Sequence, residues 1–74
     1  MKSHFGLKNR VKEYRQNKGW SQKELAEQVF SSRNTIVAIE NGKFCPSGYL
    51  CACLCAVFDC KFEDLFYLAD DEDE

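Results

Sequence analysis

The sequence predicts an all-α fold, a compact bundle of five short helices in which strands are limited to tiny pieces near the two ends. Three observations favour this prediction. Apolar residues recur at helical spacing through most of the chain, a serine precedes three of the apolar stretches, and a glycine follows two of the expected helices. A chain of 74 residues has room for one hydrophobic core, so residues 1–69 are expected to form one domain and residues 70–74 an acidic tail.

The first expected helix covers residues 7–18. Leu7, Val11 and Tyr14 follow one another at i, i+4 and i+7, which places them in one apolar stripe on an otherwise charged helix. Gly19 is expected to end this helix in the left-handed conformation that glycine adopts without steric cost.

The second helix is expected to begin after Ser21 and to run to about Val29. Ser21 and Glu24 have the spacing of a capping box, in which each side chain accepts a hydrogen bond from the other residue's backbone amide. Trp20, just before the cap, is in position to pack on Leu25 as a hydrophobic staple. The two signals together predict a helix start at this point.

A three-residue turn, 30–32, separates the second helix from a third one, expected over residues 33–41. Ser32 is its expected N-cap, Ile36 and Ile39 share its inner face, and the Asn-Gly pair at 41–42 is expected to end it. Ser47 is then expected to cap a fourth, mostly apolar helix that extends to about residue 58. Residues 62–68 are predicted to form a short fifth helix.

The charge is divided unevenly along the chain. Residues 1–43 carry nine Lys or Arg against four acidic residues, whereas residues 44–74 carry one Lys against eight acidic residues. The net charge of −2 therefore hides a positive first part and a negative second part. Because the field near a surface depends on local charge, the first part is suited to a polyanionic partner.

Several classes of protein are not supported by the sequence. No stretch approaches the roughly 18 apolar residues of a membrane span, and the N-terminus lacks the apolar run of a secretory signal, so a cytoplasmic protein without a membrane partner is expected. The sequence gives no sign of catalysis. It has no nucleophile with a nearby histidine, no glycine-rich phosphate loop and no converging carboxylates outside the tail. The chain is therefore expected not to be an enzyme and to need no cofactor.

The second and third expected helices form a pair joined by a tight turn, and the third has polar residues in its first turn. A helix of this kind fits a major groove about 12 Å wide, with its N-terminal side chains at the base edges. The segments SQKELAEQV (21–29) and SRNTIVAIENGK (32–43), followed by Pro46 and Ser47, resemble the helix-turn-helix of the Xre family, the Cro/C1-type repressor domains. The resemblance covers about residues 7–68.

The resemblance implies a transcriptional regulator, expected to be a repressor, that binds double-stranded DNA with the helix at residues 33–41. The residues that it implies at the bases are Gln22, Arg33, Asn34, Val37 and Ala38. Those that it implies at the phosphates are Lys23, Ser32, Thr35, Asn41 and Lys43, with the backbone amides near Gly42. It also implies a structural ion pair between Arg15 and Glu40. Ser32 and Thr35 fit equally well a role limited to capping and lining the helix.

The chain departs from the family pattern in the turn. Phe30 stands where the family most often has glycine, and Ser31 stands where it usually has an apolar residue. A bulky residue at positive φ costs roughly 1–2 kcal/mol, so either the turn has another shape or Phe30 is displaced to fill the apolar space. Gly48 also weakens the start of the fourth helix.

Five cysteines are the other unusual feature, at positions 45, 51, 53, 55 and 60. An odd number in a reducing compartment predicts free thiols. Cys51 and Cys55 are expected to face inward and to pack as small apolar side chains, with Cys53 pointing away. The alternative is a metal- or redox-responsive regulator in which Cys45 or Cys60 joins them, although no C-x-x-C pair is present and His4 is the one histidine.

A homodimer is expected, because one short helix reads too few base pairs for useful specificity and two-fold pairing doubles the site. The surface predicted for this dimer consists of Phe62, Leu65, Phe66 and Tyr67. A different class of function also fits the sequence, a protein-interaction module such as an antitoxin or a phage-encoded partner binder, in which the acidic tail mimics DNA or contacts a basic partner.

Overall fold

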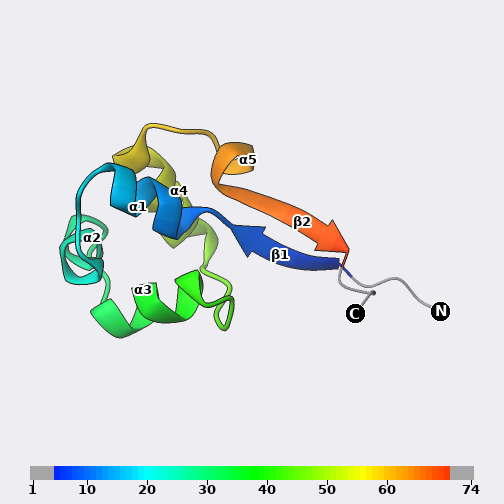
Figure 1. The fold of residues 1–74 in the computed structure, drawn as a ribbon, viewed down its shortest axis with the longest axis horizontal. Coiled ribbons are helices and arrows are strands. Elements are labelled where there is room, and N and C mark those ends of the chain that lie inside the picture. The colour runs from blue at the N-terminus through cyan, green and yellow to red at the C-terminus, as the bar shows by residue number, and fades with distance from the viewer. Residues whose placement is uncertain (1–4, 71–74) are drawn as a thin grey trace.

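The computed structural model describes residues 5–70. Its elements in chain order are β1 (Phe5–Asn9), α1 (Val11–Asn17), α2 (Gln22–Gln28), α3 (Arg33–Glu40), α4 (Gly48–Phe58), α5 (Phe62–Leu65) and β2 (Phe66–Asp70). The helices gather in one body, and the two strands form a ribbon that projects from it (Figure 1). The predicted mostly helical fold with five helices and two short terminal strands is therefore confirmed.

The strands correct two predicted helix boundaries. The first helix begins at Val11 rather than at residue 7, and the fifth ends at Leu65 rather than at residue 68. Residues 5–9 and 66–70 instead pair as antiparallel strands, with Leu7 opposite Leu68. The backbone amide of Arg10 continues the connection by donating to the carbonyl of Leu65 at 2.8 Å. Helical spacing could not reveal this pairing, because each strand finds its hydrogen-bond partners at the other end of the chain.

The hydrophobic core collects side chains from every helix and from β2. Its buried apolar members are Val11, Leu25, Ala26, Val29, Ile36, Ile39, Leu54, Phe58, Leu65 and Phe66. The inner face predicted for the third helix, Ile36 and Ile39, is confirmed. Around this core, Tyr14 and Trp20 pack against Phe58, with ring centroids 5.5 and 6.1 Å apart, so that α1 and the segment before α2 are held to α4.

Local signals set the helix ends as the sequence predicts. The Ser21 hydroxyl accepts from the amide of Glu24 at 3.0 Å, and the Glu24 carboxylate accepts from the amide of Ser21 at 2.8 Å. Ser32 and Ser47 accept in the same way from the amides three residues later. Each serine satisfies an amide at the helix start that has no partner within the helix, which stabilises the start by about 1 kcal/mol.

The turn between α2 and α3 keeps its left-handed residue although that residue is not glycine. Phe30 has φ +57°, and its side chain is 88% exposed. The amide of Ser31 donates to the carbonyl of Ala26 at 2.9 Å, which closes the end of α2. The suggestion that Phe30 fills an apolar space is therefore wrong, and the suggestion of a differently shaped turn is not needed. The turn accepts a strained backbone at Phe30 and leaves its ring in solvent.

Candidate nucleic-acid interface

The orientation of α3 is fixed by an ion pair at its last residue. The guanidinium of Arg15, in α1, donates to the Glu40 carboxylate from Nε to Oε2 at 2.7 Å and from Nη2 to Oε1 at 3.2 Å. Arg15 also donates from Nη1 to the carbonyl of Trp20 at 2.9 Å. Both side chains are largely buried, so the pair is shielded from water and its geometry is well defined. The predicted pairing of Arg15 with Glu40 is present.

A second hydrogen bond holds α3 to the strand ribbon. The Asn9 side chain donates from Nδ2 to the carbonyl of Ile39 at 3.0 Å, and its Oδ1 accepts from the amide of Val11 at 3.1 Å. One side chain therefore joins the end of β1, the start of α1 and the last turn of α3. This role of Asn9 was not predicted, and no local pattern identifies it, because its partner lies thirty residues away.

The first turn of α3 presents its polar side chains to solvent. Arg33 and Asn34 are exposed, whereas Val37 and Ala38, one turn later, are half-buried. The opposite side of the helix is in the core through Ile36. The predicted base-contacting residues of α3 thus lie on the accessible side of a helix whose inner side is fixed.

Gln22 is attached to the same ion pair. Its Nε2 donates to Glu40 Oε1 at 3.1 Å, and the side chain is half-buried. The amide group therefore connects the start of α2 to the end of α3. This anchoring was not predicted, since Gln22 was expected only at the DNA.

The residues predicted at phosphates differ in how free they are. Lys23, Asn41 and Lys43 are exposed. The Ser32 hydroxyl accepts from the amide of Thr35 at 3.1 Å and lies 2.9 Å from the Thr35 hydroxyl, so both serve the start of α3.

One expectation for the phosphate contacts is wrong. The amide of Gly42 donates to the carbonyl of Ile39 at 3.0 Å, and the amide of Lys43 donates to the carbonyl of Ala38 at 2.9 Å. These amides close the C-terminal turn of α3, with Gly42 at φ +75°, and are not available to a phosphate.

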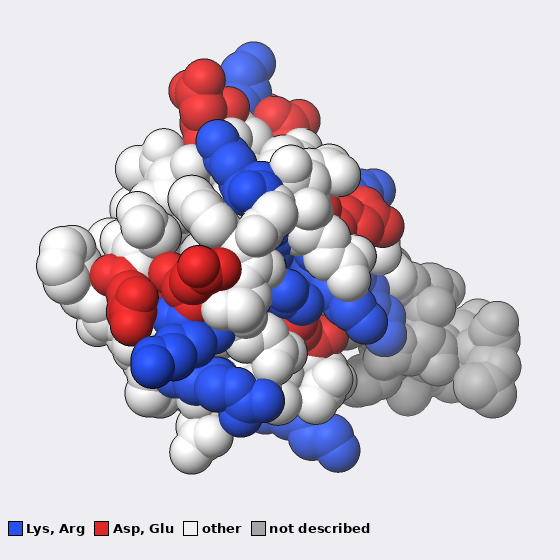
Figure 2. Space-filling view, turned by 60° about the vertical axis from the view of Figure 1, so that its left-hand side comes forward, with Lys and Arg blue, Asp and Glu red and all other residues white. Residues whose placement is uncertain are grey.

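The charges on this side suit a polyanion. Lys23, Arg33 and Lys43 are exposed on α2, on α3 and in the loop after α3. In Figure 2, which turns α2 and α3 toward the viewer, Lys and Arg side chains gather across the lower part of the molecule. Contact with a phosphate backbone requires positive charge on the contacting surface. The surface that carries the exposed helix α3 meets this requirement.

Four of the five cysteines lie around the core rather than at this surface, and Cys45 is exposed. Cys51, Cys53, Cys55 and Cys60 are half-buried against the core cluster, so the expectation that Cys53 points away from it is wrong. Burial raises the pKa of the Cys51, Cys55 and Cys60 thiols above the ordinary thiol value.

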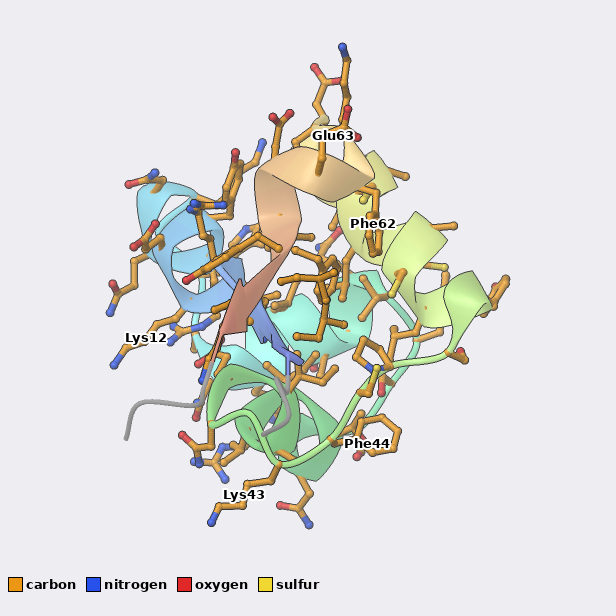
Figure 3. All side chains as sticks on the ribbon, turned by 90° about the vertical axis from the view of Figure 1, so that its right-hand side faces the viewer. Lys12, Lys43, Phe44, Phe62 and Glu63 are labelled. Carbon is orange, nitrogen blue, oxygen red and sulfur yellow. The ribbon has the colours of Figure 1, made fainter. Side chains whose placement is uncertain are left out.

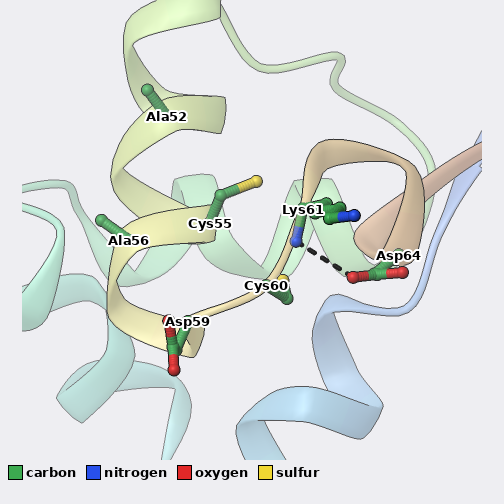
Figure 4. A pocket seen from close by; sticks show the side chains of 7 residues that line it. All are labelled: Ala52, Cys55, Ala56, Asp59, Cys60, Lys61 and Asp64. Carbon is green, nitrogen blue, oxygen red and sulfur yellow. Dashed lines mark hydrogen bonds between the residues drawn. The ribbon is translucent and has the colours of Figure 1, made fainter.

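Cys55 and Cys60 line a pocket of about 670 Å³ at the end of α4, together with Lys61 and Asp64 (Figure 4). Among residues 5–70, no three His, Cys, Asp or Glu side chains are grouped so that they could hold a metal ion.

The predicted dimer surface is half wrong. Leu65 and Phe66 are buried in the core cluster of the single chain, at 0% and 2% exposure. Phe62 and Tyr67 remain exposed, and Phe62 stacks on Phe66 with ring centroids 5.0 Å apart. The guanidinium of Arg10 covers one face of the Tyr67 ring at 4.2 Å.

None of the helices in the described part of the chain has the length and apolar character to cross a membrane.

Comparisons with known proteins agree with this geometry. An uncharacterized HTH-type transcriptional regulator of Bacillus subtilis, YgzD, is 43% identical over 65 residues, which cover 88% of this chain and 98% of the relative. The competence pilus inhibition repressor of Acinetobacter baylyi is 32% identical over 63 residues, which cover 85% of this chain and 57% of that repressor.

A solved structure has the same fold. The crystal structure of the clp gene regulator ClgR from Corynebacterium glutamicum matches with a TM-score of 0.67 at 28% identity. The match covers 73% of this chain and 57% of the ClgR chain, so the present chain corresponds to a little over half of that regulator. The helix-turn-helix family itself matches residues 11–65. The chain therefore belongs to the helix-turn-helix family of DNA-binding transcriptional regulators, of the Xre or Cro/C1 type.

Proposed function

We propose that this protein is a cytoplasmic repressor that binds a specific DNA sequence as a homodimer and reads it with α3 in the major groove. The observation that carries the proposal is the placement of Arg33 and Asn34. Both are exposed in the first turn of a helix whose far end is held by Glu40. Readout needs side chains that reach base edges from a support that does not shift, and α3 has both properties.

The reading residues have complementary chemistry. The guanidinium of Arg33 is suited to donate to O6 and N7 of a guanine, and the amide of Asn34 is suited to pair with N6 and N7 of an adenine. Val37 and Ala38 offer apolar contact, for instance to a thymine methyl group. Within residues 5–70 the Oε1 of Gln22 accepts no hydrogen bond while its Nε2 donates to Glu40, so in this proposal Gln22 joins the reading set as an acceptor at the edge of the groove.

The second set of side chains holds the phosphates. Lys23, Asn41 and Lys43 are exposed on both sides of α3 and supply charge and hydrogen-bond donors. The hydroxyls of Ser32 and Thr35, which cap α3, stand at the helix start, where a phosphate is also favoured. Such contacts fix register and give salt-sensitive affinity without sequence preference.

Two arguments support a homodimeric repressor. A helix of eight residues contacts only about four base pairs, and a two-fold pair doubles that number. One relative is named as a repressor, the competence pilus inhibition repressor.

Selection of bound duplexes from a random pool tests the proposal. We expect a two-fold symmetric consensus with half-sites about one helical turn apart. Arg33→Ala and Asn34→Ala should each relax the preference at a different position, at a cost of roughly 1–3 kcal/mol against the preferred base. Lys61→Ala, which removes an exposed lysine just before α5, is the matched control and should leave the consensus unchanged. A consensus that neither reader variant alters would remove α3 from its assigned role.

A further inference from the structure

The C-terminal end of α4 places two cysteines at positions whose side chains meet. The amide of Asp59 donates to the carbonyl of Ala56 at 3.3 Å, and the amide of Cys60 donates to the carbonyl of Cys55 at 3.1 Å. Between these bonds Asp59 has φ +54°. Two such bonds around a left-handed residue form a Schellman motif, in which the residue after the left-handed one packs on the residue five positions before it. Here these two residues are Cys60 and Cys55.

The two thiols share one pocket and influence each other. Cys55 and Cys60 are half-buried in the pocket at the end of α4, and the other residues that line it are exposed, so a small solute can reach them. Burial is the main cause of the raised pKa of both thiols. Against this effect Cys60 lowers the pKa of Cys55, whereas Cys55 raises that of Cys60 further. Of the two, Cys55 therefore has the thiolate that its neighbour stabilises.

The other neighbouring thiols are less well placed for a covalent bond. Cys51 and Cys55 lie four residues apart on one helical face, where the Cβ atoms are about 5–6 Å apart. A disulfide needs Cβ atoms within about 3.5–4.5 Å, so an intact helix keeps this pair from closing. Cys45 and Cys51 both donate to the carbonyl of Pro46, at 3.9 and 3.8 Å. They are the competing pair that an experiment has to exclude.

We propose that Cys55 and Cys60 are a modification site, a dithiol that hydrogen peroxide converts into a disulfide within the folded chain. The Cys55 thiolate attacks one peroxide oxygen, the O–O bond breaks, and the released hydroxide leaves as water with the Cys55 proton. The thiolate of Cys60 then attacks the sulfur of the resulting sulfenic acid, the S–O bond breaks, and a second water leaves with the Cys60 proton. Two thiols thus lose two electrons, and one peroxide becomes two waters.

A small thiol reverses the modification by exchange, in which two of its molecules are oxidised to one disulfide. Disulfides in a reducing compartment are transient for this reason, which agrees with free thiols in the resting protein. The inference goes beyond the proposed function and does not depend on it, because neither cysteine is among the proposed DNA contacts.

The disulfide would join α4 to the last two elements of the chain. Cys60 directly precedes the segment that starts α5, where the amide of Lys61 donates to Asp64 Oδ2 at 3.0 Å in an exposed position. Figure 3 shows α5, marked by Phe62 and Glu63, next to the last turn of α4. The core includes residues from both α5 and β2. A covalent bond to α4 limits the separation of α5 and β2 from the core in the unfolded chain, so oxidation should stabilise the fold.

Peptide mapping of the peroxide-treated full chain tests the assignment. The reduced protein, at low micromolar concentration, should lose two of its five free thiols and remain a single chain on a non-reducing gel. Cleavage after Lys43, before Asp59 and after Lys61 separates Cys60 from the other four cysteines. The peptide 59–61 should stay attached to the peptide 44–58 until a reductant is added.

Single substitutions identify the partner of Cys60. Cys55→Ala and Cys60→Ala should each abolish the disulfide, and dimedone should then trap a sulfenic acid on Cys55 in Cys60→Ala. Cys53→Ala is the matched control, because Cys53 is half-buried on the same helix and does not line the pocket. It should form the disulfide as the natural chain does. Circular dichroism of the reduced variants verifies their folding, and the map of the natural chain decides the assignment even if one of them unfolds.

Thermal unfolding measures the consequence. The oxidised natural chain should melt at least about 4 °C above the reduced one, whereas peroxide treatment of Cys60→Ala should give no such gain. A bond between Cys45 and Cys51, a cross-link between two copies, or oxidation that leaves Cys60 free would overturn the proposed site. An unchanged melting temperature after the expected bond has formed would overturn its stabilising role.

Discussion

Arg15 and Glu40 form an ion pair that joins α1 to α3, with both carboxylate oxygens engaged at 2.7 and 3.2 Å. The Glu40 side chain is only 3% exposed and that of Arg15 11%. Glu40 also accepts from Gln22. A single carboxylate therefore sets the angle between three helices, and the presentation of α3 depends on it.

Removal of one partner of this pair should cost more stability than removal of both. Glu40→Leu leaves the guanidinium of Arg15 buried without its counter-charge, at an expected cost of about 3–5 kcal/mol. The double variant, with Arg15→Met added, should lose less stability than Glu40→Leu alone, and therefore less than the sum of the two single changes. Urea unfolding of the four proteins measures the coupling, and Glu27→Leu, an exposed acid on α2, is the control. Additive losses would show that the pair does not act as a unit.

The strained turn predicts a stabilising substitution. Phe30→Gly should raise the free energy of unfolding by about 1 kcal/mol, because glycine adopts φ +57° without the steric cost of a Cβ and the exposed ring makes little contribution to the core. Phe30→Ala keeps the Cβ and should give no comparable gain. Thermal unfolding of both variants separates the backbone effect from the loss of the ring. Equal melting temperatures for the two variants would refute the strain explanation.

Salt dependence distinguishes phosphate contacts from base contacts. Lys43→Ala should weaken binding to preferred and unrelated duplexes alike, and should reduce the slope of log K against log salt by about 1. Arg33→Ala should instead act mainly on the preferred duplex. Titration of each variant at several salt concentrations gives both quantities. An unchanged slope in Lys43→Ala would place that lysine away from the phosphates.

The half-buried thiols of α4 and of the segment after it predict a loss of stability at alkaline pH. Burial raises the pKa of Cys51, Cys55 and Cys60 in the folded chain, so folding favours their protonated forms. Their contribution is complete below the ordinary thiol pKa of about 8.5 and is lost as the pH rises through the raised values. Urea unfolding under reducing conditions should show this decline. Replacement of all three cysteines by alanine should flatten it, and an equally steep decline in that variant would assign the effect to other groups.

Much of the site follows from local sequence. The caps at Ser21 and Ser32 and the inward residues Ile36 and Ile39 each depend on contacts within one or two helical turns, so spacing alone identifies them. Once those helix ends are known, the exposure of Arg33 in the first turn of α3 follows. The ion pair was implied by family resemblance and not by spacing, since its two members lie twenty-five residues apart.

What the sequence determined by itself is therefore the starts of α2, α3 and α4 and the inner face of α3. Only the tertiary structure decided that residues 5–9 and 66–70 pair as strands, that Leu65 and Phe66 belong to the core, and that Asn9 holds the end of α3. The physical reason is the range of the interactions. A cap or an apolar stripe is complete within a few residues, whereas a strand and a buried amide acquire their partners only after the helices have brought distant parts of the chain together.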